Sequence, residues 1–230
     1  HTCGLSSIGR ITCWGVDDGT VGKDYGQVTD TPTDLGFVET SGYNAHNCAI
    51  AADQSIDCWG ADGQGQSTPP AGTDFEVLES YNDYNCALDS QGAIHCWGQD
   101  INLVNYPPTV TGMVQLEVGH RNACALDDLG SITCWGGDGE GQVTDVPTVT
   151  GYVDIAITDV SSGTHEQICA INATGYIECW GWDPNDVPPP TSGDFIQLTG
   201  GEDFLCALTA TSQNTGGEIN CWGLATRTVN

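Results

Sequence analysis

Cysteine is the residue type whose spacing implies chemistry most clearly in this 230-residue chain. Twelve cysteines fall into six pairs, separated by ten positions in five pairs and by fifteen in the last. The pairs are Cys3 and Cys13, Cys48 and Cys58, Cys86 and Cys96, Cys124 and Cys134, Cys169 and Cys179, and Cys206 and Cys221. Such cysteines could form disulfides or bind zinc, but zinc sites favour clustered spacings such as C-x2-C, which are absent here.

Aspartates recur in the polar segments that follow each Trp-Gly dipeptide and could supply oxygen ligands to calcium. They are Asp17, Asp18, Asp62, Asp100, Asp138 and Asp183. Calcium binds about six to eight oxygens, whereas each segment offers only one or two carboxylates. The same residues fit turns in which an aspartate caps its own backbone. Calcium is therefore the one cofactor that the sequence suggests, with turn capping as the alternative.

Aromatic residues outside the repeated motif form a candidate binding surface. Trp182 follows a Trp-Gly dipeptide, matches no other repeat and lies in a Pro-rich segment. Tyrosine and tryptophan are favoured at interfaces because they offer large contact area at a low entropy cost. The candidates are Trp182, Tyr106, Tyr25, Tyr43 and Tyr81. Partial burial at the edge of the fold is the alternative.

Other signals of chemistry are sparse. Asn172-Ala-Thr174 matches the sequon for N-glycosylation. No Ser-His-Asp arrangement, phosphate-binding loop or metalloprotease motif is visible. Carboxylates are so abundant that no pair of them indicates glycosidase chemistry. We therefore predict no catalytic residues.

The elements that position these residues come from a repeat marked by the tripeptide Cys-Trp-Gly, which occurs six times. Its tryptophans are 45, 38, 38, 45 and 42 residues apart. A period near 40 indicates one supersecondary unit stacked on copies of itself. The approximate repeats are 1-32, 33-70, 71-108, 109-147, 148-190 and 191-230, and we expect them to form a single domain.

The third repeat shows why the cysteines of one pair should meet. Folding the segment about Gln91 places Cys86 opposite Cys96 and Leu88 opposite Ile94. The loop then ends in Gly92, which suits a hairpin turn whose last residue has a left-handed backbone conformation. Directly opposed residues of an antiparallel pair lie close enough for a disulfide. We therefore predict one disulfide within each hairpin.

Further strands precede the hairpins and polar segments follow them. Alternating apolar residues mark strands such as 75–79, 113–118, 152–157 and 195–198, while glycine, aspartate and proline dominate the segments after each Trp-Gly. Short strands divided by turn residues, without helical periodicity, indicate an all-β fold. Because the tryptophans recur at one position, we expect them to pack between repeats.

The complete repeat, Cys-Ala-Leu-x3-Gly-x-Ile-x-Cys-Trp-Gly-x-Asp-x-x-Gly-Gln, resembles that of the regulator of chromosome condensation family. The segments 1–5 and 135–142 match it especially well. The resemblance covers almost the whole chain and implies a β-propeller. It is also similar to a cysteine-bearing version in secreted bacterial proteins, which include a β-lactamase inhibitor. Six blades are expected, or seven if a further strand set completes the ring, as is usual in that family.

Composition limits the partners. The net charge is −27, from 31 Asp and Glu against four Lys and Arg. Such a polyanion is repelled by DNA, RNA and anionic membranes, and no apolar run is long enough to span a bilayer. Paired cysteines favour an oxidising compartment, so an extracellular or cell-surface location is expected. The chain begins with histidine, which suggests that a leader has been removed or that this is a fragment.

These observations favour an extracellular, non-enzymatic interaction or structural module. We expect it to bind a protein or glycan partner through the variable loops of the first, third and fifth repeats. Assembly into a filament or surface layer is a variant of this hypothesis, because a neighbouring molecule could supply a strand to the incomplete first repeat. The alternatives are a polysaccharide-active secreted enzyme and a secreted enzyme inhibitor.

Overall fold

Nearly all of the regular structure is β-sheet in the computed structural model, which describes residues 1–20, 22–99, 101–158, 166–182, 188–191, 193–201, 204–210 and 217–223. The strands of the first three repeats are β1 (Thr2–Leu5), β2 (Ile11–Trp14), β3 (Phe37–Tyr43), β4 (His46–Ala51), β5 (Ile56–Gly60), β6 (Phe75–Tyr81), β7 (Tyr84–Asp89) and β8 (Ile94–Gly98). Those of the last three are β9 (Met113–Val118), β10 (Asn122–Asp127), β11 (Ile132–Gly136), β12 (Tyr152–Ile157), β13 (Gln167–Asn172), β14 (Ile177–Gly181), β15 (Phe195–Gly201), β16 (Phe204–Thr209) and β17 (Ile219–Gly223).

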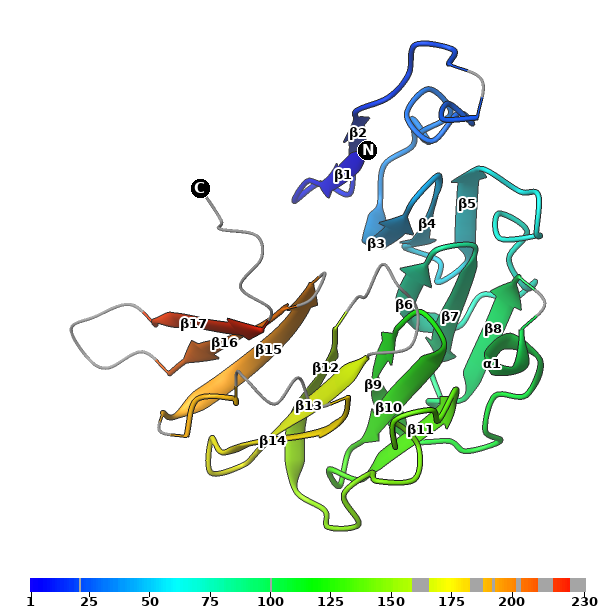
Figure 1. The fold of residues 1–230 in the computed structure, drawn as a ribbon. Coiled ribbons are helices and arrows are strands. Elements are labelled where there is room, and N and C mark those ends of the chain that lie inside the picture. Colours follow the sequence, from blue (N-terminus) through cyan, green and yellow to red (C-terminus); the bar gives the residue numbers. More distant parts are fainter. Residues whose placement is uncertain are drawn as a thin grey trace. The chain divides into compact units, whose positions relative to one another are not determined.

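Each repeat folds into its own small antiparallel sheet (Figure 1). The second, third, fifth and sixth repeats give three-stranded sheets in chain order, whereas the first gives only the pair β1-β2. The fourth repeat supplies β9, β10 and β11, of which β10 and β11 form the hairpin. The strands predicted ahead of the hairpins are confirmed. The one-turn helix α1 (Asn102–Asn105), which periodicity did not reveal, lies in the loop after β8.

All six hairpins carry the predicted disulfide. The paired cysteines face each other directly, with Cα atoms 4.0 to 4.1 Å apart. In the third repeat Leu88 lies opposite Ile94, and Gly92 has a φ of 68°. The second repeat departs from the glycine rule, because Gln54 takes the left-handed position with a φ of 64°. In the five hairpins whose cysteines are ten positions apart, this spacing determines both the register of the two strands and the pairing of the cysteines.

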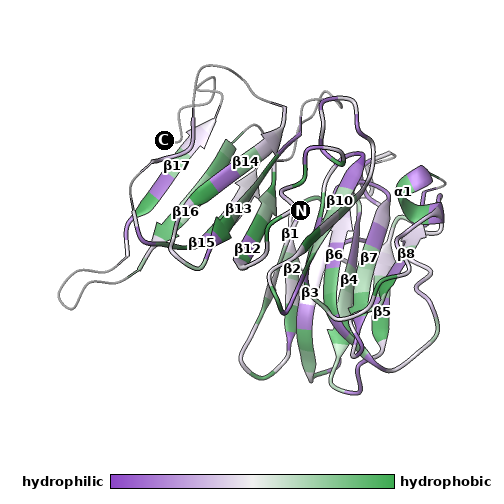
Figure 2. Ribbon diagram, turned by 90° about the horizontal axis from the view of Figure 1, so that it is seen from below, coloured by the Kyte–Doolittle hydropathy of each residue, from purple (hydrophilic) through white to green (hydrophobic). Residues whose placement is uncertain are grey.

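The hydrophobic core lies between consecutive sheets. In one cluster Ile50 and Ile56 of the second repeat pack against Phe75, Leu78 and Trp97 of the third. A comparable cluster joins the fifth and sixth repeats through residues that include Ile171, Phe195 and Trp222. Figure 2 shows apolar stretches within the strands and more hydrophilic loops.

Five of the repeated tryptophans are only 6 to 8% exposed. Trp59, Trp97, Trp180 and Trp222 lie in clusters with residues of the preceding repeat, which confirms for these four that they pack between repeats. Trp14 differs, with 55% exposure.

The chain divides into two compact units, His1–Val118 and Gly119–Asn230. Each is described by itself. The first unit contains the strands β1 to β9, and the second contains β10 to β17. The expectation of a single domain stays a prediction.

Candidate functional site

In the first, second and fourth repeats the polar segment after Trp-Gly is built around a buried glutamine, which is Gln27, Gln66 or Gln142. In the second repeat Gln66 is buried and its side-chain oxygen accepts a hydrogen bond from the Gln64 N–H at 2.8 Å. Its backbone carbonyl accepts from Trp97 Nε1 at 3.1 Å and from Asn85 Nδ2 at 2.8 Å. Gln27 and Gln142 likewise accept from Trp59 and Trp180. The Gly-Gln sequence therefore ties each segment to the next repeat.

His46 completes this junction in the first unit. The side chain is fully buried, and its Nε2 lies 2.8 Å from Asn85 Oδ1. Burial lowers the pKa of His46, although the hydrogen bond that His46 donates to Asn85 Oδ1 and nearby carboxylates act in the opposite direction. A histidine held neutral between two sheets is suited to packing and hydrogen bonding.

Three of the aspartates predicted as calcium ligands accept hydrogen bonds from N–H groups of their own loops. They are Asp18, Asp62 and Asp138. Asp62 Oδ1 accepts from the Ser67 N–H at 2.9 Å, and Asp138 Oδ1 accepts from the Val143 N–H at 2.8 Å. Asp18 accepts from Thr20 in the same way. Hydrogen bonds from the backbone of Val143 and Thr144 lower the pKa of Asp138. These contacts match the turn-capping alternative.

The other proposed calcium ligands provide no further evidence for a metal site. Asp17 is exposed, and Asp100 and Asp183 lie outside the described residues. In the described part of the chain no group of three or more His, Cys, Asp or Glu side chains could hold a metal ion. Specific calcium binding stays a prediction.

The five aromatic candidates differ in their exposure and surroundings, and a common binding surface stays a prediction. Tyr43 and Tyr81, at the ends of β3 and β6, stack with their ring centroids 4.5 Å apart. Tyr43 is half-buried and Tyr81 is buried. Trp182 is half-buried, and its backbone N–H donates a hydrogen bond to the Glu166 carbonyl at 3.0 Å. Tyr25 and Tyr106 alone point largely into solvent, with 48 and 75% exposure.

Tyr106 is held outward by an anchored loop. It follows α1, in which Leu103 is 1% exposed and inserts into the protein. Its N–H donates to the carbonyl of Asn102 at 3.0 Å and closes the helical turn. The loop of the third repeat, which lacks Gly-Gln, therefore presents an aromatic ring from a fixed base.

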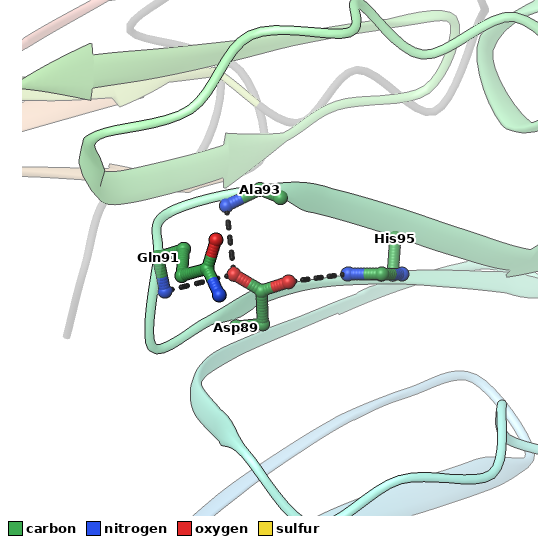
Figure 3. Close-up of polar contacts among 4 residues, drawn as sticks. All are labelled: Asp89, Gln91, Ala93 and His95. Carbon is green, nitrogen blue, oxygen red and sulfur yellow. Dashed lines mark hydrogen bonds and ion pairs between the residues drawn. The ribbon is translucent and has the colours of Figure 1, made fainter.

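Hairpin loops are capped by a polar residue three positions after the first cysteine. Asp89 Oδ1 accepts from the Gln91 and Ala93 N–H groups at 2.9 and 3.0 Å, and Oδ2 pairs with His95 Nε2 at 2.9 Å (Figure 3). Partial burial raises the pKa of Asp89, but the hydrogen bonds from His95, Ala93 and Gln91 outweigh it and lower the pKa. The cap is therefore strongest when the carboxylate is ionised.

The sequon residue Asn172 holds the same capping position. Its side-chain oxygen accepts from the Thr174 N–H at 3.0 Å, the Thr174 hydroxyl at 2.7 Å and the Tyr176 N–H at 3.2 Å. The amide oxygen is thus engaged in the loop, and Thr174 is exposed. Glycosylation of Asn172 stays a prediction.

Inner-strand carboxylates line a cavity that the sequence did not reveal. The cavity of about 440 Å³ lies wholly in the first unit, beside β1, β3 and β6. Its lining includes Glu39, Ser41, Asn47 and Glu79. Glu39 accepts a hydrogen bond from the Leu78 N–H at 3.2 Å, so a carboxylate of one repeat satisfies an edge N–H of the next.

Both carboxyl groups of the cavity hold protons more tightly than usual. Burial raises the pKa of Glu39. Burial, followed by repulsion from Glu117 and Glu39, raises the pKa of Glu79 well above its ordinary value, while a hydrogen bond from Ser41 opposes the shift. Two carboxyl groups from neighbouring repeats that favour the protonated form therefore line the same cavity.

Comparison with known proteins identifies the architecture. No family model and no curated protein matches the chain. Among solved structures, Prp20p from Saccharomyces cerevisiae superposes with a TM-score of 0.69 at 15% identity, covering 96% of this chain and 69% of that one. Another structure of Prp20 names it yeast RCC1 and holds it bound to Kap60.

Two further solved structures are also similar to this chain. The CRINKLY WD40 ectodomain of the Arabidopsis thaliana receptor kinase ACR4 gives a TM-score of 0.54 at 20% identity, covering 96% of this chain and 90% of that one. Human WBSCR16 gives 0.63 at 15% identity, covering 81% of this chain and 61% of that one. At such identities the likeness shows the fold alone. The chain has an all-β, RCC1-like propeller fold in which every blade hairpin carries a disulfide.

Proposed function

We propose that this protein is an extracellular, non-enzymatic interaction module that binds a protein or glycan partner through loops between its blades. The observation that carries the proposal is the exposed Tyr106, presented by a loop that buried Leu103 anchors. Exposed Tyr25 in the first repeat offers a second contact of the same kind. Aromatic side chains held on a rigid base bind with little loss of entropy.

Several further observations support this proposal. The six disulfides are compatible with an oxidising compartment outside the cell. Prp20p has binding properties toward Gsp1p and histones, and the ACR4 domain is a receptor ectodomain. Nucleic acid is disfavoured as a partner by the charge of −27. Among the described residues, no helix is long and apolar enough to cross a membrane.

A paired assay tests the proposal. The intact chain would be screened on a glycan array and used to capture proteins from the medium in which it occurs, beside the variants Tyr106→Ser and Tyr25→Ser. We expect each substitution to weaken capture of the bound species. Ile219→Ser is the control, because Ile219 is an exposed apolar residue at the start of β17, away from the loops that follow Trp-Gly. Capture that survives both loop substitutions together would reject these loops as the binding surface.

A polysaccharide-active enzyme is the second candidate, because Glu39 and Glu79 share a cavity and both have a raised pKa. Glycosidases use a protonated carboxyl group as the acid and a second carboxylate as base or nucleophile. Turnover of a polysaccharide panel that Glu79→Gln abolishes would establish this activity. Turnover unchanged by Glu79→Gln would exclude the cavity as its source.

A further inference from the structure

Exposed apolar side chains gather at one end of the blades in the second unit. They are Leu129, Val149, Val153, Tyr176 and Ile196, each 52 to 71% exposed. We call this set the hairpin rim. All five belong either to a hairpin loop between the second and third strands of a blade or to the segment where the next inner strand begins. The loops after Trp-Gly leave their strands at the opposite end.

Backbone hydrogen bonds hold the hairpin rim together. The Gly151 N–H donates to the Leu129 carbonyl at 3.1 Å, and the Ala173 N–H donates to the Gly151 carbonyl at 3.0 Å. The Phe195 N–H then donates to the Gly175 carbonyl at 3.4 Å. Backbone hydrogen bonds therefore join the loops of successive repeats to the adjacent strands. The backbone that carries the exposed side chains is held in place by these bonds.

The apolar character of the rim is not required by the fold. Val153 and Ile196 directly follow the buried aromatic residue at a shift in strand register. The third repeat has the same shift, and there the equivalent residue is the exposed Glu76. Leu129 likewise corresponds to Gln91 in its hairpin loop. At the same shift in the second repeat Val38 is apolar and exposed, so both kinds of residue are accepted at this position and burial does not require an apolar one.

The surroundings of the rim are acidic. Asp128 and Asp194 are exposed next to it, and Asp127 caps the loop that contains Leu129. Arg121 is the one Lys or Arg between positions 119 and 210, and it precedes β10, at the end of the blade away from the hairpin loop. A surface that combines apolar side chains with unopposed carboxylates complements a ligand with apolar and basic groups.

From this combination we propose that the hairpin rim docks a basic, amphipathic segment of a partner protein. Apolar residues of the segment would cover Leu129, Val153 and Ile196, while its Lys or Arg side chains face Asp128 and Asp194. An anionic membrane or a second copy of this chain would bring carboxylates against like charge. The inference rests on the proposed function, since it names a partner class for the same interaction module, but it uses a different surface.

A synthetic peptide of leucine and lysine in amphipathic helical spacing is the direct probe. Its affinity for the intact, disulfide-bonded chain would be measured by calorimetry, beside a lysine and serine peptide of equal charge. The rim variant is Leu129→Gln, Val153→Thr, Ile196→Thr. The control is Val16→Thr, Ile219→Thr, which alters exposed apolar residues outside the rim. Neither variant changes the net charge, and because every altered side chain is exposed both should fold with all six disulfides.

We expect the leucine and lysine peptide to bind the rim variant at least about tenfold more weakly than the parent or the control. The lysine and serine peptide should bind weakly and equally to all three proteins. Equal binding of the first peptide to all three proteins would overturn the proposal, because charge alone would explain it. Self-association of the parent that the rim variant abolishes would identify a second copy as the occupant and would also overturn it.

The two hypotheses fail separately. Loss of partner capture in Tyr106→Ser with an unaffected rim variant would reject the rim and keep the proposed function. A different result would reject the loops. If the chain captures no partner and binds no glycan, the loops are rejected as the binding surface. The rim proposal is then still supported if the rim variant binds the leucine and lysine peptide more weakly than the parent.

Discussion

At the scale of single residues, the hairpin caps show which part of a side chain the fold requires. Asp89 and Asn172 both use one oxygen to accept two backbone N–H groups of their loops. In these two hairpins the oxygen makes the cap and the charge is secondary, whereas the second repeat has Ala51 at this position and uses Asp53 to cap its loop.

This difference gives a first prediction. Asp89→Ala should lower the free energy of unfolding by about 1 to 2 kcal/mol, because it leaves two loop N–H groups without an acceptor. Asp89→Asn should cost less than about 1 kcal/mol, since it keeps the oxygen and loses only the charged contact to half-exposed His95. Urea unfolding would measure both. Asp128→Ala, which removes an exposed aspartate from the hairpin loop of the fourth repeat, is the control, and an equal loss there would contradict the prediction.

Glu79 gives a prediction for pH. Because its pKa is raised in the folded protein, the folded state holds the proton at pH values where the unfolded state has released it. Stability from this group is present below the ordinary glutamate pKa and is lost as pH rises through the raised pKa. Unfolding free energies measured from pH 4 to 8 should therefore fall less steeply in Glu79→Gln than in the parent.

The matched control for this measurement is Glu76→Gln, which removes the same charge from an exposed position on the same strand. It should reduce only the general repulsion expected for a chain of net charge −27. If Glu76→Gln flattens the pH dependence as much as Glu79→Gln does, burial of Glu79 is not the cause.

At the scale of the element, the tryptophan of one blade joins it to the loop of the preceding repeat. Trp97→Phe would keep most of the buried ring but remove the hydrogen bond from Nε1 to the Gln66 carbonyl. We expect a loss of about 1 to 2 kcal/mol in unfolding free energy. Trp14→Phe is the control because its side chain is largely exposed, and it should change stability little. Equal losses would show that the hydrogen bond contributes nothing.

Much of each hairpin could be predicted from the sequence, because its contacts are local. Cys86 and Cys96 are ten positions apart, so a three-residue loop alone determines that they meet. The stacking of Tyr43 on Tyr81 could also have been predicted, since each lies five positions before the first cysteine of its hairpin and the two repeats are neighbours.

Other features depended on contacts between repeats and were missed. The spacing of Glu39 and Glu79 does not show that they share a cavity, because they occupy different positions in their repeats. Val153 and Ile196 were assigned to regular strands, and the register shift that exposes them has no mark in the sequence. Side-chain direction at such a shift is decided by the neighbouring strand.

At the scale of the whole molecule, charge is the dominant property. Screening reduces repulsion among 31 acidic residues, so sodium chloride should raise the melting temperature. At matched ionic strength we expect calcium and magnesium to act equally, because the loop N–H groups already bind Asp62 and Asp138. Calorimetric scans would compare the two ions. A rise specific to calcium would instead establish the binding site suggested by the sequence.

Each sulfur finds its partner within its own hairpin, and this has a consequence for oxidative refolding. A reduced, denatured chain needs no long-range search, since each closure spans only ten or fifteen positions. Low contact order of this kind favours rapid recovery and few scrambled isomers. Newly made chains could therefore acquire their cross-links one blade at a time as they emerge, before the later blades exist.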